Sequence, residues 1–309
     1  MTQEEPKHLF GSGHTACAGC GQAIAARLVV DVTGKNTIIA NNTGCLEVFS
    51  TKYPESAWGV PWIHSLFENA AAVASGIEAA LKYLGIKDKI TVISQAGDGG
   101  TADIGLQALS GMWERGHDII SICYDNEAYM NTGVQRSGLT PFGTSTSTSP
   151  SGAKSTGNPI LKKPMPEIAL AHGLPYVATA STGYPHDVQR KIKKAVSIKG
   201  PKYIQIHVPC PLGWRHDPQI TYDIAKLAVE TGLYPLIEYE NGKLSAVRKL
   251  TKIKPVEEYL KFQGRFKHIL GLPEQLKQIQ AIADNNIEKY GLRAEAPPLA
   301  QQGLIEGGK

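Results

Sequence analysis

The chain has 309 residues, of which 42% are hydrophobic and 19% are charged, a composition typical of a compact soluble protein. Its formal net charge of +4 is too small to indicate a nucleic-acid-binding protein, and no dense run of Lys and Arg changes that view. Residues 1–7 lack the basic-then-apolar pattern of a secretory signal, and no apolar run approaches the roughly 18 residues needed to span a bilayer. We therefore expect a cytoplasmic protein with no nucleic-acid or membrane partner.

Helix-like and strand-like runs alternate along the first two thirds of the chain. In chain order they are a helix over 22–33, a strand over 37–40, a helix over 66–84, a strand over 90–95, a helix over 105–115, a strand over 118–124, a helix over 165–173, a strand over 175–181, a helix over 185–198 and a strand over 202–208. This alternation predicts an α/β fold with a doubly wound, mostly parallel sheet. The intervening residues 136–164 are rich in Ser, Thr, Gly and Pro, which fits either a mobile linker or an ordered lid.

After Asp217 the alternation weakens. We predict a hairpin over 236–244 that turns at Asn241-Gly242, followed by helices near 255–262 and 273–290. The chain therefore divides into an α/β domain over 1–217, which carries the candidate site, and a C-terminal extension over 218–309. The extension would pack on that domain or on a partner subunit.

Two polar loops follow neighbouring strands. Gly97-Asp98-Gly99-Gly100 comes directly after the strand over 90–95, and Asn126 begins the loop after the strand over 118–124. A strand–helix–strand unit places both loops at the C-terminal edge of a parallel sheet, where such folds bind ligands. Glycine amides, a carboxylate and a carboxamide oxygen together suit Mg²⁺ and the phosphates that it would bridge.

The spacing of these loops resembles the diphosphate-anchoring motif of thiamine-diphosphate enzymes. In that motif Asp98, the Asn126 side chain and the Ala128 carbonyl would hold Mg²⁺. The alternative is two unrelated turns, because Gly-Asp-Gly also occurs in ordinary turns.

Four of the five cysteines form a second group. Cys17 and Cys20 make a CxxC motif set among glycines, and Cys45 and Cys210 each follow an apparent strand. Cys123 lies inside a strand and is typical of a small core residue. A CxxC motif with two distant single cysteines suits a [4Fe–4S] cluster, although the spacing alone also leaves a zinc site or no metal open.

With both groups considered, the chain resembles the β subunit of the pyruvate:ferredoxin oxidoreductase family, the thiamine-diphosphate subunit of the 2-oxoacid oxidoreductases. The resemblance covers most of residues 8 to 268. Its most specific segments are Cys17–Gly21, Thr43–Val48, Pro61–Asn69, Gly97–Gly105, Tyr124–Ser137 and Leu227–Gly232.

The resemblance implies a set of site residues. Cys17, Cys20, Cys45 and Cys210 would ligate a [4Fe–4S] cluster close to the cofactor. Asn131 would lie near the reacting 2-oxoacid, and Gln22 stands where the family often has a Glu, so it could hydrogen-bond but lacks the charge. The residues implied to contact thiamine diphosphate are Gln22, Cys45, Gly97, Asp98, Gly99, Gly100, Asn126, Glu127, Ala128, Tyr129, Met130 and Asn131.

The resemblance also implies an activity and partners. The expected reaction is oxidative decarboxylation of pyruvate to acetyl-CoA and CO₂, with one-electron transfer from the thiamine adduct through the cluster to ferredoxin. Another 2-oxoacid (2-oxoisovalerate, 2-oxoglutarate or oxalate), or a non-redox thiamine-diphosphate decarboxylase, is the alternative. An α-type subunit would supply the activating glutamate and most substrate contacts. Because the chain lacks the cysteine run of a two-cluster ferredoxin, a ferredoxin-like subunit or domain would pass the electrons on.

Overall fold

The computed structural model describes residues 8–52 and 55–294. Residues 1–7, used above to assess a targeting signal, and residues 295–309 of the predicted C-terminal extension lie outside the described residues. Among the described helices, none has the length and apolar character that crossing a membrane requires.

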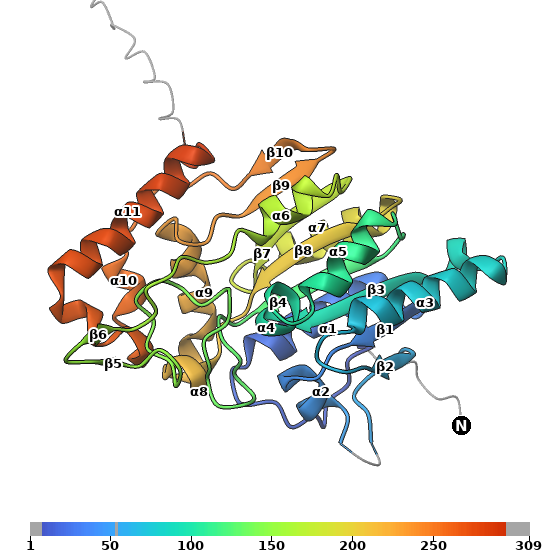
Figure 1. The fold of residues 1–309 in the computed structure, drawn as a ribbon, viewed down its shortest axis with the longest axis horizontal. Coiled ribbons are helices and arrows are strands. Elements are labelled where there is room, and N and C mark those ends of the chain that lie inside the picture. The colour runs from blue at the N-terminus through green and yellow to red at the C-terminus, as the bar shows by residue number, and fades with distance from the viewer. Residues whose placement is uncertain (1–7, 53–54, 295–309) are drawn as a thin grey trace, which may run out of the picture.

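Helices and strands alternate along the chain, as Figure 1 shows. The elements are α1 (Gly21–Thr33), β1 (Thr37–Asn41), α2 (Cys45–Ser50), β2 (Trp62–His64), α3 (Ala70–Tyr83), η1 (Lys87–Lys89), β3 (Thr91–Gly97), α4 (Asp98–Ala102), α5 (Leu106–Glu114), β4 (Ile120–Asp125), β5 (Ser151–Gly152), β6 (Ser155–Thr156), α6 (Met165–Ala171), β7 (Tyr176–Ser181), α7 (Pro185–Ser197), β8 (Lys202–His207), α8 (Pro211–Trp214), η2 (Pro218–Ile220), α9 (Thr221–Glu230), β9 (Ile237–Glu240), β10 (Lys243–Val247), α10 (Glu257–Leu260), η3 (Gly264–Phe266), η4 (Ile269–Gly271) and α11 (Pro273–Lys289).

The main sheet confirms the predicted α/β fold. Within the described residues its strand order is β10-β9-β7-β8-β4-β3-β1-β2, and the strands from β7 to β2 are parallel. The sequence pattern did not predict β2, whose three residues are too few to show a period. It also placed the start of α3 four residues too early, and the predicted helix over 255–262 is one short helical turn, α10.

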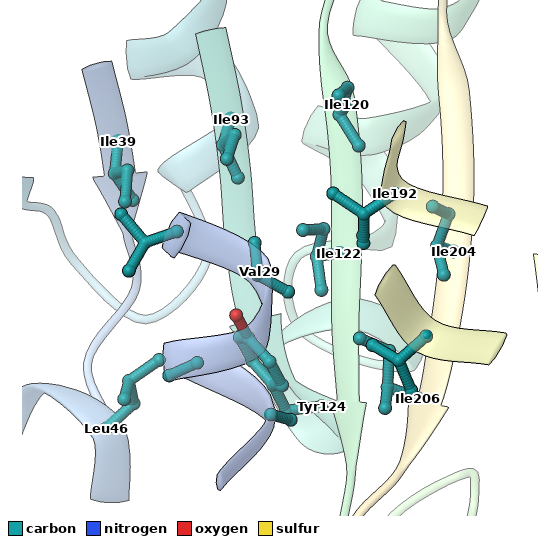
Figure 2. Packing of buried hydrophobic residues seen from close by; sticks show 14 of the residues in the cluster. Val29, Ile39, Leu46, Ile93, Ile120, Ile122, Tyr124, Ile192, Ile204 and Ile206 are labelled. Carbon is teal, nitrogen blue, oxygen red and sulfur yellow. The ribbon is translucent and has the colours of Figure 1, made fainter. Parts of the chain in front are cut away.

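Helices cover both faces of this sheet. Strand side chains alternate between the faces, so Ile120 and Ile122 of β4 join the cluster under α1 and α7, while Cys123 joins the cluster under α3, α5 and α6. Figure 2 shows Val29 of α1 and Ile192 of α7 against the isoleucines of the strands. The apolar runs that predicted strands are therefore buried on both faces, as a parallel sheet requires.

The C-terminal segment adds a hairpin to the same sheet. β9 and β10 pair around Asn241 and Gly242, which have φ of 48° and 76°, as a two-residue hairpin turn requires. β9 also pairs antiparallel with β7, so the hairpin extends the sheet beyond its parallel part. The apolar residues of α9, α10 and α11 form a further core cluster beside it.

Glu238 fastens this hairpin to the parallel sheet. Its buried carboxylate accepts hydrogen bonds from Arg190 Nη2 at 2.5 Å and from Tyr176 Oη at 2.8 Å. Burial opposes ionisation, yet these donors lower the pKa of Glu238 below its usual value. A group with a lowered pKa in the folded state contributes stability above its unfolded pKa of about 4.3, and this contribution is lost as the pH falls through the folded pKa.

We expect Glu238→Gln to lower the free energy of unfolding by about 1.5–3 kcal/mol at pH 7, the usual contribution of hydrogen bonds to a charged group. Denaturant titration should show the difference from the unchanged protein shrinking as the pH falls below about 4.3. Glu240→Gln is the matched control, because Glu240 pairs with Lys194 at 2.7 Å but is 40% exposed. Its effect should stay below about 1 kcal/mol, and equal effects of the two changes would contradict the assignment.

Candidate functional site

The C-terminal ends of β1, β3 and β4 meet at one edge of the sheet and form a cleft there. The register pairs Asn41 with Gln95 and Gly97 with Tyr124, so the residues that follow these strands lie side by side. The cleft is lined by Gln22, Asn42, Thr43, Gly44, Cys45, Leu46, Phe67, Gly97, Asp98, Gly99, Gly100, Asn126, Ala128, Tyr129, Met130, Asn131 and Thr132. Of the residues predicted to contact a cofactor, the structure brings all except Glu127 to its wall.

Three of these residues direct polar atoms to one point. One terminal atom of the Asn126 carboxamide lies 2.8 Å from the Ala128 carbonyl oxygen and 2.9 Å from Asp98 Oδ1. As an NH₂ group it donates a hydrogen bond to each of these oxygens. Rotating the amide by half a turn would place an oxygen there instead, so the same three residues can also present three converging oxygens.

Asp98 is buried, and a second acidic side chain, Asp125, lies near its carboxyl group. It begins α4, and Ser137 Oγ donates a hydrogen bond to its Oδ2. Burial raises the pKa of Asp98 well above its usual value, and the nearby Asp125 carboxylate raises it further. A carboxylate held in such a place is destabilised unless a cation reaches it.

The glycines of the first loop allow neighbouring side chains to pack closely against that loop. A Cβ at Gly99 would overlap the Tyr129 ring, and a Cβ at Gly100 would overlap the Asn42 carboxamide. Tyr129 Oη in turn donates to Gly99 O and Asp103 Oδ2, both at 3.2 Å. The absence of a side chain at Gly99 therefore lets the Tyr129 ring of the second loop pack on the first loop, and its absence at Gly100 leaves room for Asn42.

Gln22 is buried in the wall of the cleft, whereas Asn131 is exposed. Gln22, in the first turn of α1, is 4% exposed and its Oε1 has no hydrogen-bond partner. A buried unpaired oxygen is costly, so it is available to a ligand that donates. Asn131 is exposed at the rim.

Glu127 points away from the cleft into an ion-pair network. It has a φ of 70°, and its carboxylate lies 2.8 Å from Lys162 Nζ and 2.5 Å from Arg265 Nη2. Despite burial, Lys162 and Arg265 lower the pKa of Glu127 to about 2. The network therefore fixes a strained backbone position between Asn126 and Ala128.

We expect Arg265→Met to cost about 3–5 kcal/mol of unfolding free energy, because it leaves a buried carboxylate with one cation fewer. The guanidinium also stacks on the Trp214 ring at 3.7 Å. Arg248→Met is the matched control, because Arg248 stacks equally closely on Tyr184, at 3.8 Å, but is exposed. Denaturant titration should show a loss below about 1 kcal/mol for the control, and similar losses in both variants would refute the role of the network.

The predicted cluster cysteines gather beside this cleft. Burial raises the pKa of Cys45 to about 12, and Cys210, Cys20 and Cys17 each contribute to that shift. Burial raises the pKa of Cys210 to about 11, again with contributions from Cys20 and Cys17. Cys17 also raises the pKa of Cys20. Each of the four sulfurs therefore lies within electrostatic range of the other three, and none of them is in a disulfide.

Backbone contacts explain how distant cysteines meet. The Cys20 amide donates to Cys17 O at 3.1 Å, which closes the CxxC turn, and the Gly21 amide donates to Pro209 O at 3.1 Å. A Cβ at Gly21 would lie 2.8 Å from that oxygen, so this contact requires glycine. Trp214 Nε1 donates to the Asn126 carbonyl oxygen at 2.8 Å. The turn beside Cys210 is thus tied both to the CxxC motif and to the Asn126 loop.

Across residues 8–52 and 55–294, no three His, Cys, Asp or Glu side chains converge closely enough to hold a single metal ion. A [4Fe–4S] cube differs from such a centre because each of its four irons takes one thiolate. Four separate thiols are the set of ligands that such a cube requires.

Sequence reasoning missed several lining residues. Asn42 lies two residues after the predicted strand over 37–40, and its position just beyond a strand end was the available signal. Phe67 lies in the segment Pro61–Asn69 that carries the resemblance, but no local pattern marks it as a site residue. Ser137, in the segment over 136–164, does not line the cleft but donates a hydrogen bond to Asp98. That segment is folded onto the domain, with Ser137, Thr140 and Asn158 buried.

Comparison with known proteins identifies the family. Residues 42–206 match the family model described as "Thiamine pyrophosphate enzyme, C-terminal TPP binding domain". The pyruvate synthase subunit PorB of Methanosarcina barkeri is 58% identical over 296 residues, covering 95% of this chain and 100% of that relative. The ketoisovalerate oxidoreductase subunit VorB of Pyrococcus abyssi is 50% identical over 266 residues, covering 84% and 86%.

A solved structure shares the fold. The 2-oxoglutarate:ferredoxin oxidoreductase from Magnetococcus marinus superposes with a TM-score of 0.56 and 22% identity, covering 73% of this chain and 81% of that one. The family model and the relatives confirm the resemblance drawn from the motifs. The chain belongs to the 2-oxoacid:ferredoxin oxidoreductase family, among its thiamine-diphosphate-binding β-type subunits of the pyruvate synthase kind.

Proposed function

We propose that this chain holds thiamine diphosphate, Mg²⁺ and a [4Fe–4S] cluster in a complex that converts pyruvate and coenzyme A to acetyl-CoA and CO₂. Two electrons leave the substrate one at a time and reduce ferredoxin. Thiamine diphosphate, when bound, supplies an electron sink for decarboxylation, and the cluster supplies a one-electron acceptor. The observation that carries the proposal is the meeting of a convergent oxygen triad and four thiols at one sheet edge.

The triad fits Mg²⁺ in chemistry and in spacing. Mg²⁺ prefers octahedral oxygen ligands at about 2.0–2.1 Å, so neighbouring ligand oxygens lie about 2.9 Å apart. The Asn126 carboxamide lies 2.8 and 2.9 Å from the Ala128 and Asp98 oxygens, so it would act as a ligand with its oxygen turned inward. In that state Asp98 would supply the negative charge, and a bound cation would offset the burial and the nearby Asp125 carboxylate, which raise the pKa of Asp98.

The four thiols fit the cluster. Cys45 lines the cofactor cleft and also lies within electrostatic range of Cys17, Cys20 and Cys210. A cluster held by these residues would therefore adjoin the cofactor, which suits direct electron transfer. Gln22, beside the CxxC turn, would hydrogen-bond the cofactor through its unpaired Oε1.

The cleft also supports the need for an α-type partner. Among the described residues that line it there is no glutamate, since the Glu127 carboxylate is held by Lys162 and Arg265. The glutamate that activates the cofactor would therefore come from another chain. A ferredoxin-like subunit or domain would then pass electrons to ferredoxin, and we propose a cytoplasmic location for the complex.

A second candidate substrate follows from the VorB relative, which is 50% identical to this chain. That relative is named for ketoisovalerate (2-oxoisovalerate), a branched-chain 2-oxoacid. The exposed Val48 near Cys45 is one candidate for shaping the acyl pocket on this chain.

The test is viologen or ferredoxin reduction by the anaerobically co-purified complex, with a panel of 2-oxoacids. We expect pyruvate with coenzyme A to give the highest kcat/KM. A higher value for 2-oxoisovalerate would transfer the assignment to that substrate, and oxalate turnover without coenzyme A would overturn the acetyl-CoA assignment.

A further inference from the structure

A second cavity lies on the other side of the Glu127 network. Its volume is about 390 Å³, within the range of roughly 300–1,000 Å³ typical of small-molecule sites. It lies between the ends of β7 and β8, the residues around Lys162, and the C-terminal helices that Figure 1 shows beyond β7. It shares no lining residue with the cofactor cleft, so it is a separate site within the described residues.

The walls of this cavity are mainly apolar and aromatic. The rings of Phe142, Tyr234, Tyr259, Phe266 and Tyr290 line it, together with aliphatic side chains. Aromatic walls favour flat ring systems, which stack or pack edge-on against them.

His207 is a polar residue in the lining of this cavity. It ends β8, is fully buried, and neither Nδ1 nor Nε2 has a hydrogen-bond partner. Glu127 Oε1 lies 3.8 Å from Nε2, too far for a hydrogen bond. Burial lowers the pKa of His207 to about 3, with contributions from Lys162 and Arg265, so the ring is neutral and offers one donor and one acceptor. An unpaired buried imidazole is costly, and a ligand that pairs with it removes that cost.

Charged side chains at the cavity are already paired. Glu127 is held by Lys162, and Lys163 pairs with Asp103 at 3.1 Å. Glu167 of α6 pairs with Lys289 at the end of α11. Among the described lining residues no charge is left for an ionic ligand, so the cavity favours an uncharged one.

We propose that this cavity binds a small, uncharged, flat aromatic molecule whose one hydrogen-bond donor engages the unprotonated nitrogen of His207. The aromatic walls would enclose the ring system, and the paired charges leave no counter-ion for an anionic or cationic ligand among the described lining residues. The site does not depend on the cofactor assignment, because it uses none of the residues that line the cofactor cleft.

Indole and indene form a matched pair of probes, because both are flat bicycles and indole alone carries an N–H donor. Calorimetric titration of the full chain in its co-purified complex should show saturable binding of both. Indole should bind about fivefold more tightly, as expected for one hydrogen bond between uncharged groups. No saturable binding of either probe, or equal affinities, would overturn the proposal.

Two variants place the binding at this cavity. His207→Phe keeps a ring but removes both nitrogens, so indole should lose its advantage over indene, while a preference that persists would contradict the role of His207. Ala228→Leu adds bulk to a wall formed by a residue that is 1% exposed, and it should weaken both probes. Unchanged affinities in Ala228→Leu would locate the binding elsewhere and overturn the proposal even if His207→Phe did not fold.

Discussion

Cys45→Ala is expected to abolish the bound iron chromophore and to lower ferredoxin reduction at least about 100-fold. Cys45 opens α2 at the C-terminal edge of the sheet, where it lines the cleft and lies within electrostatic range of the other three predicted ligands. In the proposed cluster, its removal would leave one iron without a protein ligand and would remove the cysteine that also lines the cofactor cleft. The measurements are iron content, visible absorption and EPR of the anaerobically purified complex, together with viologen reduction.

Cys123→Ala is the matched control. Cys123 is also a free cysteine, but it lies fully buried in β4 among the apolar residues under α3 and α5. Its removal should cost about 1 kcal/mol of stability and leave iron content and turnover unchanged. Full iron content and turnover in Cys45→Ala, or a colourless zinc protein before any change, would exclude the cluster.

The sheet edge was predictable from sequence for a physical reason. Parallel strands buried on both faces produce continuous apolar runs, and β3 and β4 show such runs immediately before the Asp98 and Asn126 loops. Because a crossover helix joins them, their C-terminal ends must share an edge. Local pattern and chain connectivity were therefore enough to bring the GDGG loop and Asn126 together.

The contacts that hold the Asn126 loop in place were not predictable from the sequence in this way. Glu127 was expected to contact the cofactor, yet the structure turns its side chain toward Lys162 and Arg265. These partners are 35 and 138 residues away along the chain, so no local period or spacing reports them. The same holds for Ser137, which reaches Asp98 from a segment whose composition suited a linker equally well.

The C-terminal segment shows the same contrast. The Asn241-Gly242 turn carried a local signal, and the hairpin forms where it was predicted. Two other contacts depend on the long-range packing of α9 to α11. They are the pairing of β9 with β7 and the approach of Arg265 to the Asn126 loop. The extension thus helps to hold the Asn126 loop through Arg265 and Glu127, a role that its sequence alone did not indicate.

Asp98→Asn is expected to weaken Mg²⁺-dependent binding of thiamine diphosphate at least about 100-fold, because a buried Mg²⁺ loses the one carboxylate of the triad. The change is nearly isosteric and removes a buried charge that burial and Asp125 already disfavour. The stability of the cofactor-free protein should therefore stay equal or rise. Weaker cofactor binding without a loss of stability would indicate that a metal ligand was lost. Misfolding would instead lower both the affinity for thiamine diphosphate and the stability of the cofactor-free protein.

The measurements for Asp98→Asn are calorimetric titration of thiamine diphosphate at a series of Mg²⁺ concentrations, and denaturant unfolding without cofactor. Asp103→Asn is the matched control, since Asp103 lies in the same region and binds Tyr129 Oη, but its side chain is 26% exposed and stands outside the triad. Its Mg²⁺ requirement should change no more than about fivefold, the effect of one hydrogen bond. A carboxylate that binds the metal cannot be neutralised without weakening metal binding. Unaltered Mg²⁺ dependence in Asp98→Asn would therefore show that the converging oxygens make only a structural contact.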